Sequence, residues 1–332
     1  MNSNEMSTNP SPPWAVNIVH TCLAVQKGEK VLIIVDEPLD YVREALLREA
    51  IKANPSEVWS FTFPNAVRPF TQYPPHLLTI ATQMDVVVLL LASMDSQKEL
   101  PAWVAGREAI RKGKARFNAG AYIDQSILDR ELSADYEQIA ALTLSLADQL
   151  RGSSNVHITT PLGTDLRLSL AGREWKTDTG MLRGQGAYGN LPAGEIYIAP
   201  IEDSAEGVLV IDKSLPGLLL PEPVRLTFEK GRVTQIEGGS GAEYLQGAIA
   251  QHGEATRVIA ELGIGTNPQA RLQGNIITDE KVLGTIHIAI GRNDFIGGTN
   301  IATTHIDGVV GQPTLEIDGK LLIESGEHLL NR

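Results

Sequence analysis

Apolar positions follow two different patterns along the chain, and the first covers about 150 residues. Residues 30–36 (KVLIIVD) and 85–91 (DVVVLLL) are continuous apolar runs, which are typical of strands buried on both faces. A third strand is predicted over residues 57–63. Apolar residues at helical spacing predict helices over residues 41–53, 103–112 and 135–150. Strands that alternate with helices in this order predict a doubly wound parallel sheet, and therefore an α/β domain.

The pattern changes after residues 151–155 (RGSSN), which read as a linker. Lys230-Gly231 and Asp318-Gly319 are typical of tight hairpin turns. One helix is predicted over residues 242–251, with an extension past Gly253 to residue 260. The other segments are short and β-rich, and strands are predicted over residues 156–159, 165–170, 195–198, 207–211, 224–229, 232–237, 284–290, 314–317 and 320–324. This half is therefore expected to be mainly antiparallel β structure.

Three segments follow from these patterns. Residues 1–13 are polar and proline-rich and predict a disordered tail. Residues 14–152 predict an α/β scaffold domain, and residues 153–332 predict a β-rich domain, for which the acidic and histidine residues and the resemblance given below imply metal binding and catalysis. The scaffold domain has no glycine-rich phosphate loop between its first strand and first helix, which argues against a dinucleotide site.

The composition argues against several classes of binding partner and of metal ligand. The 332 residues include 28 Lys and Arg against 40 Asp and Glu, a net charge of −12, which argues against nucleic acid or an anionic membrane surface. The single cysteine, Cys22, excludes an intrachain disulfide and a thiolate cluster. Any metal site must therefore use Asp, Glu and His. Since no secretory signal or long apolar run is visible, we expect a cytoplasmic protein.

Five acidic or histidine side chains of the second half are candidates for such a site. His305 and Asp307 are two residues apart, so a strand would direct both side chains to one face. His287, Glu261 and Glu195 each lie in a segment that is otherwise apolar. Each residue alone is also typical of a structural hydrogen bond. Buried charges are costly unless they are paired or metal-bound, so the five together favour a divalent ion with oxygen and imidazole ligands.

An ordered series of motifs adds a family resemblance. It runs from residue 163 to residue 324, and this part of the chain resembles the C-terminal half of the aminopeptidase T, or M29 metallopeptidase, family. The motifs are Gly163-Thr-Asp-Leu166, Ala171-Gly-Arg173, Pro192-Ala-Gly-Glu195, Ala199-Pro-Ile-Glu-Asp-Ser-Ala-Glu-Gly207, Ala260-Glu-Leu-Gly263, His287-Ile-Ala-Ile-Gly291 and His305-Ile-Asp307.

The resemblance implies a hydrolase with two divalent ions per chain, Zn, Co or Mn, that activates water against the amide bond at a peptide N-terminus. It places the metal ligands on Glu195, Glu261, His287, His305 and Asp307, the five residues that chemistry alone selects. Glu261 would bridge the two ions, which would hold the attacking hydroxide. The family also supports a homodimer, which would cover the exposed edges of the antiparallel half.

One departure from the family concerns its tyrosine. The chain has Arg292-Asn-Asp-Phe295 where the tyrosine is expected, and the segment from His287 to His305 is shorter than in peptidase members. Asn293 and Asp294 are possible replacements, and we predict that Asp294 is catalytic. Three further polar residues are predicted either to orient the ligands and contact substrate or to be ordinary surface groups: Arg173, Glu202 and Asp203.

A second branch of the same family offers an alternative. Ring-opening dioxygenases of dihydroxypyridine resemble the M29 proteins in this half and hold one ferrous ion through two histidines and an aspartate, which would be His287, His305 and Asp307 here. The sequence thus leaves three hypotheses: an aminopeptidase-like hydrolase, a mononuclear Fe(II) dioxygenase, and a metal-binding relative without activity. The substrate would be a small peptide or another small molecule.

Overall fold

The computed structural model of the chain describes residues 10–95 and 98–329, which form two compact units. Of these described residues, 10–95, 98–137 and 180–192 belong to the first unit, and 138–179 and 193–329 belong to the second. Most of the predicted tail, residues 1–9, lies outside the described residues, and Pro13 already begins helix α1 (Pro13–Val16). The predicted domain boundary at residue 152 falls between α6 (Tyr136–Gln149) and strand β5.

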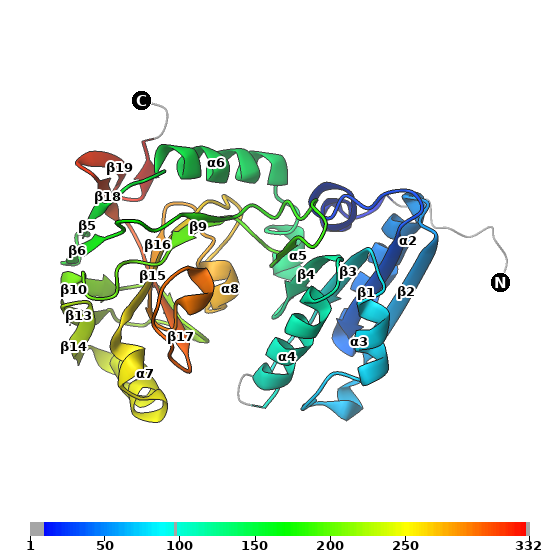
Figure 1. Cartoon of the computed structure of the whole chain (residues 1–332), viewed down its shortest axis with the longest axis horizontal. Helices are drawn as coiled ribbons and strands as arrows, with labels where there is room; N and C mark the ends of the chain where they lie inside the picture. Colours follow the sequence, from blue (N-terminus) through cyan, green and yellow to red (C-terminus); the bar gives the residue numbers. More distant parts are fainter. Residues whose placement is uncertain (1–9, 96–97, 330–332) are drawn as a thin grey trace. The chain divides into compact units, whose positions relative to one another are not determined.

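The first unit is built on a parallel sheet with the strand order β2-β1-β3-β4-β8 (Figure 1). Its apolar strands are buried because helices accompany the sheet, as the predicted α/β fold class requires. The strands are β1 (Lys30–Asp36), β2 (Glu57–Phe63), β3 (Val86–Leu90), β4 (Arg116–Gly120) and β8 (Tyr188–Gly189). The main helices are α2 (Asp40–Lys52), α3 (Pro75–Ala81), α4 (Leu100–Arg111) and α5 (Gln125–Asp129).

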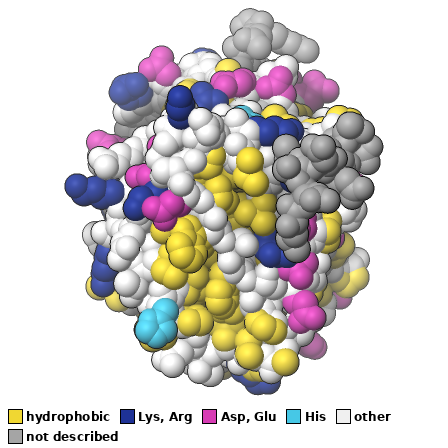
Figure 2. Space-filling view, turned by 90° about the vertical axis from the view of Figure 1, so that its right-hand side faces the viewer, with side chains coloured by type: hydrophobic (Ala, Val, Ile, Leu, Met, Phe, Trp, Pro, Cys, Tyr) yellow, Lys and Arg dark blue, Asp and Glu magenta, His cyan; other side chains and the backbone are white. Residues whose placement is uncertain are grey.

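Strand β2 is the edge of this sheet and is only partly covered. The side chain of Trp59 is half exposed, and Phe61, Val67 and Phe70 help to line a hollow of about 380 Å³. Figure 2 shows that hydrophobic side chains form a band over the face of the molecule on which β2 lies. None of the described helices is long and apolar enough to cross a membrane.

The second unit contains two mainly antiparallel sheets, which confirms the predicted β-rich second half. One sheet has the order β14-β13-β10-β6-β5-β18-β19-β20. Its strands are β5 (Asn155–Thr159), β6 (Asp165–Ser169), β10 (Glu206–Ile211), β13 (Val224–Glu229), β14 (Arg232–Glu237), β18 (Thr314–Ile317), β19 (Lys320–Glu324) and β20 (Glu327–His328).

The other sheet has the order β12-β11-β17-β16-β15-β9-β7 and carries the candidate site. Its strands are β7 (Lys176–Asp178), β9 (Glu195–Ile198), β11 (Ser214–Leu215), β12 (Leu218–Leu219), β15 (Ile259–Gly265), β16 (Ile286–Gly291) and β17 (His305–Val310). One continuous apolar cluster joins both sheets, and Ile196, Leu262 and Ile288 contribute to it from this sheet. These residues alternate along their strands with the candidate ligands.

One predicted element is wrong. Helix α7 (Gly239–His252) does not continue to residue 260, because Gly253 adopts a φ of 88° and ends it. A 3₁₀ turn (Glu254–Arg257) follows, and β15 then begins at Ile259. Ala260 and Glu261 therefore lie on a strand. The short helix α8 (Ile276–Asp279) precedes β16.

Candidate metal centre

The five predicted ligands lie on four neighbouring strands of the second sheet. Glu195 begins β9, Glu261 lies in β15, His287 in β16, and His305 and Asp307 in β17. Their strands are apolar apart from the candidate ligands and glycines, and because side chains alternate, each strand buries one face in the core and offers the ligands on the other.

The strand register puts these side chains on one face. Gly263 is paired with His287, and Ala289 is paired with both Glu261 and Asp307. Paired residues of an antiparallel sheet share a face, as do residues two apart on one strand. The site therefore arises from pairing between strands that are far apart in the sequence.

Glu261 lies between the two imidazoles. Its Oε1 is 3.3 Å from Nε2 of His287, and its Oε2 is 3.2 Å from Nε2 of His305. Asp307 Oδ1 is also 3.2 Å from the same nitrogen of His305. Glu261, His305 and Asp307 form one group whose ligand atoms all lie within 4.8 Å of one another. This spacing is suited to a single divalent cation with imidazole and oxygen ligands.

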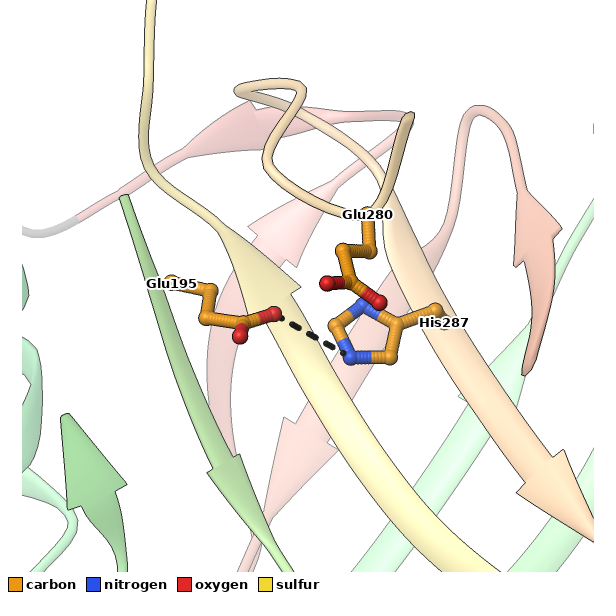
Figure 3. Close-up of side chains that lie close together, drawn as sticks. All are labelled: Glu195, Glu280 and His287. Atoms are coloured by element: carbon orange, nitrogen blue, oxygen red, sulfur yellow. Dashed lines mark ion pairs between the residues drawn. The ribbon is translucent and has the colours of Figure 1, made fainter. Parts of the chain in front are cut away.

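A second group consists of Glu195, Glu280 and His287, again with ligand atoms within 4.8 Å. Figure 3 shows the three side chains converging, and a dashed line joins Glu195 to His287. The Oε2 of Glu195 is 3.4 Å from Nε2 of His287. Glu280 directly follows α8 and enters from outside the sheet. The contact between His287 and Glu261 connects the two groups into one cluster, in which Glu261 lies between the histidines.

The hydrogen bonds of the two imidazole rings fit metal ligation better for His305 than for His287. Nδ1 of His305 is 2.6 Å from the main-chain oxygen of Arg292, so this nitrogen carries the proton and Nε2 is left for a cation. Nδ1 of His287 and Oε2 of Glu195 are buried and make no hydrogen bond within the described part of the chain. This buried oxygen of Glu195 lies beside the imidazole of His287, so a nearby positive charge would stabilise it.

The shifted pKa values of the two histidines and of Glu261 show that the site stabilises positive charge next to its carboxylates. Burial opposes charge on His287, but its hydrogen bond to Glu261 and the charges of Glu195 and Glu261 raise its pKa to about 9. Burial likewise opposes charge on His305, yet Asp307 and Glu261 hold its pKa well above the usual range. The pKa of Glu261 is lowered to about 2, against the effect of burial, by both histidines. Without metal, protons on the imidazoles balance the carboxylates.

Gly263 creates the space for His287. It lies directly across the strand pair from the histidine, and a Cβ atom at residue 263 would collide with the imidazole ring. Only glycine lets the ring lie over β15 and reach Glu261 on the same strand.

The other predicted site residues lie outside the two groups. Arg173 forms an ion pair of 2.6 Å with Glu202 and also donates to the main-chain oxygen of Gly297. Glu202 accepts from the amide of Asn293 at 3.0 Å and from the main-chain N–H of Thr299 at 2.6 Å. These bonds fasten the segment between β16 and β17.

Two predicted residues have surface positions. Asp294 is exposed and held by Arg292, with Nε–Oδ1 and Nη2–Oδ2 distances of 2.5 and 3.0 Å, and this guanidinium lowers the pKa of the carboxyl. Asp203 is exposed. The catalytic role of Asp294 stays a prediction. The neighbouring Phe295 is 60% exposed, and its ring lies edge-on to His305 with centroids 5.3 Å apart.

Sequence reasoning missed three charged residues of the site. Glu280 and Lys281 follow a four-residue helix, and Asp178 lies on the short edge strand β7. Lys281 is 2.5 Å from Glu195 Oε1, 2.8 Å from Glu280 Oε1 and 3.6 Å from Asp178 Oδ2. Adjacent Glu and Lys residues usually indicate a solvated turn, so the sequence offered no signal that Lys281 is buried and that the two carboxylates are largely covered.

Comparison with known proteins gives the two resemblances that the sequence motifs indicated, one to a dihydroxypyridine dioxygenase and one to aminopeptidases. Residues 16–329 match the profile of the NicX family, described as 2,5-dihydroxypyridine 5,6-dioxygenase. The 2,5-dihydroxypyridine 5,6-dioxygenase of Pseudomonas putida is 27% identical over 194 residues, 54% of this chain and 55% of that protein. Aminopeptidase AmpS of Bacillus subtilis is 26% identical over 178 residues, 47% and 43% of the two chains. The match covers only about half the length of each relative.

Solved structures extend the likeness in fold to nearly the whole chain. The Pseudomonas putida dioxygenase has a TM-score of 0.75 at 21% identity and covers 96% of both chains. Aminopeptidase AmpT of Thermus thermophilus has a TM-score of 0.74 at 19% identity and covers 95% of this chain and 98% of its own. At these identities the structures support the fold, an α/β unit followed by a β-rich unit.

Proposed function

Because the chain belongs to the NicX family, we propose that it is a metal-dependent, ring-opening dioxygenase of a small dihydroxylated aromatic ring, with a dihydroxypyridine as the first candidate substrate. The observation that carries the proposal is the group of Glu261, His305 and Asp307, on a chain whose family match runs from residue 16 to residue 329. The aminopeptidase and dioxygenase relatives both make an enzyme plausible.

The ion would be held by His305, Asp307 and Glu261, with His287 next to Glu261. A ferrous ion held by these residues would supply the redox chemistry that allows O₂ to react with a dihydroxylated ring. Both oxygen atoms of one O₂ enter the product as one ring carbon–carbon bond breaks, so no external reductant is needed. The main-chain oxygen of Arg292 keeps Nε2 of His305 directed at the ion, and Glu261 holds its partner imidazoles in place.

The exposed ring of Phe295 supports an aromatic substrate. It lies edge-on against His305, has the Arg292 guanidinium 6.0 Å from its centroid and presents most of its surface to solvent. A substrate ring could pack on it in the offset geometry that aromatic pairs prefer. We therefore assign substrate positioning to Phe295.

The test is an oxygen-uptake assay after anaerobic loading with ferrous iron, with 2,5-dihydroxypyridine as substrate. We expect uptake of one O₂ per substrate and a product heavier by two oxygen atoms. His305→Ala and Asp307→Asn should lose more activity than the roughly 10–100-fold cost of removing an outer partner of a ligand. Metal loading without uptake, on this and related dihydroxylated rings, would exclude the proposed reaction.

A two-metal aminopeptidase is the second candidate, and the position of Glu261 favours it. Each oxygen of this carboxylate faces a different imidazole, as a ligand that bridges two ions would. Loading with Zn, Co or Mn followed by a panel of peptides with free N-termini tests it. Release of the first residue, lost in Glu261→Gln, would establish the hydrolase. Tight metal binding with neither activity would leave a non-catalytic relative. The cytoplasmic location and the homodimer stay predictions.

A further inference from the structure

A lysine ammonium lies inside the candidate metal centre. The side chain of Lys281 is 1% exposed, and its Nζ contacts Glu195 at 2.5 Å and Glu280 at 2.8 Å, with Asp178 at 3.6 Å. A buried ammonium is stable only when carboxylates surround it, and here three do. Lys281 is therefore part of the charge balance of the site.

The backbone fixes Lys281 in this position. Its main-chain oxygen accepts from the N–H of Asn267 at 2.9 Å, and its N–H donates to Thr278 at 3.0 Å. A Cβ atom at Gly265 would collide with the backbone of Lys281 and Val282, so the glycine lets this segment pass close over β15. Main-chain hydrogen bonds and the close approach to Gly265 therefore fix the position of Lys281.

The ammonium contacts both carboxylates of one ligand group through Oε1, whereas the oxygen that Glu195 turns toward His287 is Oε2. Glu195 and Glu280, with His287, make up that group, and Nζ of Lys281 contacts Oε1 of each carboxylate. A divalent ion there would share ligands with a fixed positive charge and be repelled by it. In the part of the chain that the structure describes, no lysine or arginine pairs with Glu261 or Asp307, so the other group lacks such a cation.

We infer that Lys281 is a built-in cation that replaces a second metal ion in the Glu195–Glu280 group and limits the chain to one divalent ion, held by Glu261, His305 and Asp307. The inference rests on the proposed metal-dependent function and deepens it, because one ion per chain suits the dioxygenase and two suit the hydrolase. Lys281 is a positioning residue that sets metal stoichiometry through Glu195 and Glu280.

Metal content tests this without any assay of activity. The purified chain is saturated with Mn²⁺, desalted and measured by mass spectrometry, and its electron paramagnetic resonance spectrum is recorded. We expect one ion per chain with a single-ion spectrum for the wild type. Lys281→Met keeps the side-chain length but removes the charge, so it should rise to two ions per chain with a spin-coupled spectrum. Lys213→Met, which removes a partly exposed lysine paired with Asp212, is the matched control and should stay at one.

The outcomes separate this inference from the proposed function. No ion in the wild type would overturn both, whereas two ions in the wild type would overturn only the role of Lys281. One ion in both the wild type and a folded Lys281→Met would also overturn that role. If Lys281→Met folds poorly without metal, thermal melting decides: we expect a second equivalent of Mn²⁺ to raise its melting temperature but not that of the wild type.

Discussion

At the residue scale, Gly263 determines whether His287 can reach its partners. We expect Gly263→Ala to push the imidazole off β15, weaken metal affinity about tenfold or more, and cost about 1–3 kcal/mol of unfolding free energy from overpacking. Isothermal titration with Mn²⁺ and chemical denaturation measure both effects. Gly247→Ala in α7 is the control, because nothing lies within 4 Å of its Cβ position, and it should stabilise the chain by about 0.5–1 kcal/mol. Equal metal affinity in the two variants would contradict the role of Gly263.

Single residues also show which parts of the candidate site could be predicted from the sequence. The five predicted ligands lie together because each was an acid or histidine in an apolar strand, where the alternation of side chains carries the information. Glu280 and Lys281 were missed because their burial depends on tertiary packing against β15. Arg173 and Glu202 were identified as polar residues near the motifs, but their partners, Gly297, Asn293 and Thr299, are distant in sequence.

At the scale of elements, Arg173 and Glu202 fasten the segment between β16 and β17. We expect Arg173→Ala to free this segment and cost about 1–3 kcal/mol, since both partners are mostly buried. Hydrogen exchange at residues 293–300 should rise, while metal content stays unchanged because neither residue belongs to the ligand groups. Arg151→Ala removes an exposed pair with Asp148 and should cost less than about 1 kcal/mol. Loss of metal in Arg173→Ala would instead place this arginine in the site.

The predicted elements were accurate where the pattern was uniform. Strand β1 has the predicted bounds because its continuous apolar run leaves no alternative, and β2 also has the predicted bounds. Strand β4, with the polar sequence RFNAG, was not predicted. The first two residues of β15 were assigned to helix, and the remainder was not predicted as a strand because Glu261 and two glycines interrupt its apolar residues. The interruptions are the site itself, so the features that made the strand hard to predict are those that make it functional.

At the scale of the whole molecule, the histidines link stability to pH. The raised pKa of His287, about 9, stabilises the metal-free fold fully below the unfolded value near 6.5, and this contribution is lost as the pH rises through 9. We expect the melting temperature of the metal-free chain to fall between pH 7 and 9, less so in His287→Gln. Metal affinity should rise over the same range, because the ion displaces protons from the imidazoles. A melting temperature independent of pH and identical in both chains would contradict this linkage.

At the same scale, the open edges of the sheets bear on whether the protein forms a dimer. The predicted homodimer was expected to cover edges of the antiparallel half, where the sheets end at β14, β20, β12 and β7. The parallel sheet has a further open edge at β2, under the hydrophobic band of Figure 2. An open edge with apolar neighbours favours association.

The separation of ligands from Phe295 has a consequence for evolution and engineering. The proposed ligands Glu261, His305 and Asp307 lie on strands, whereas Phe295 lies on the segment between β16 and β17, whose ends are anchored by the pairing of Gly291 with His305. This segment can change length or composition while the paired strands keep the ligands in place. New substrates could therefore be acquired by exchanging one loop, without rebuilding the metal centre.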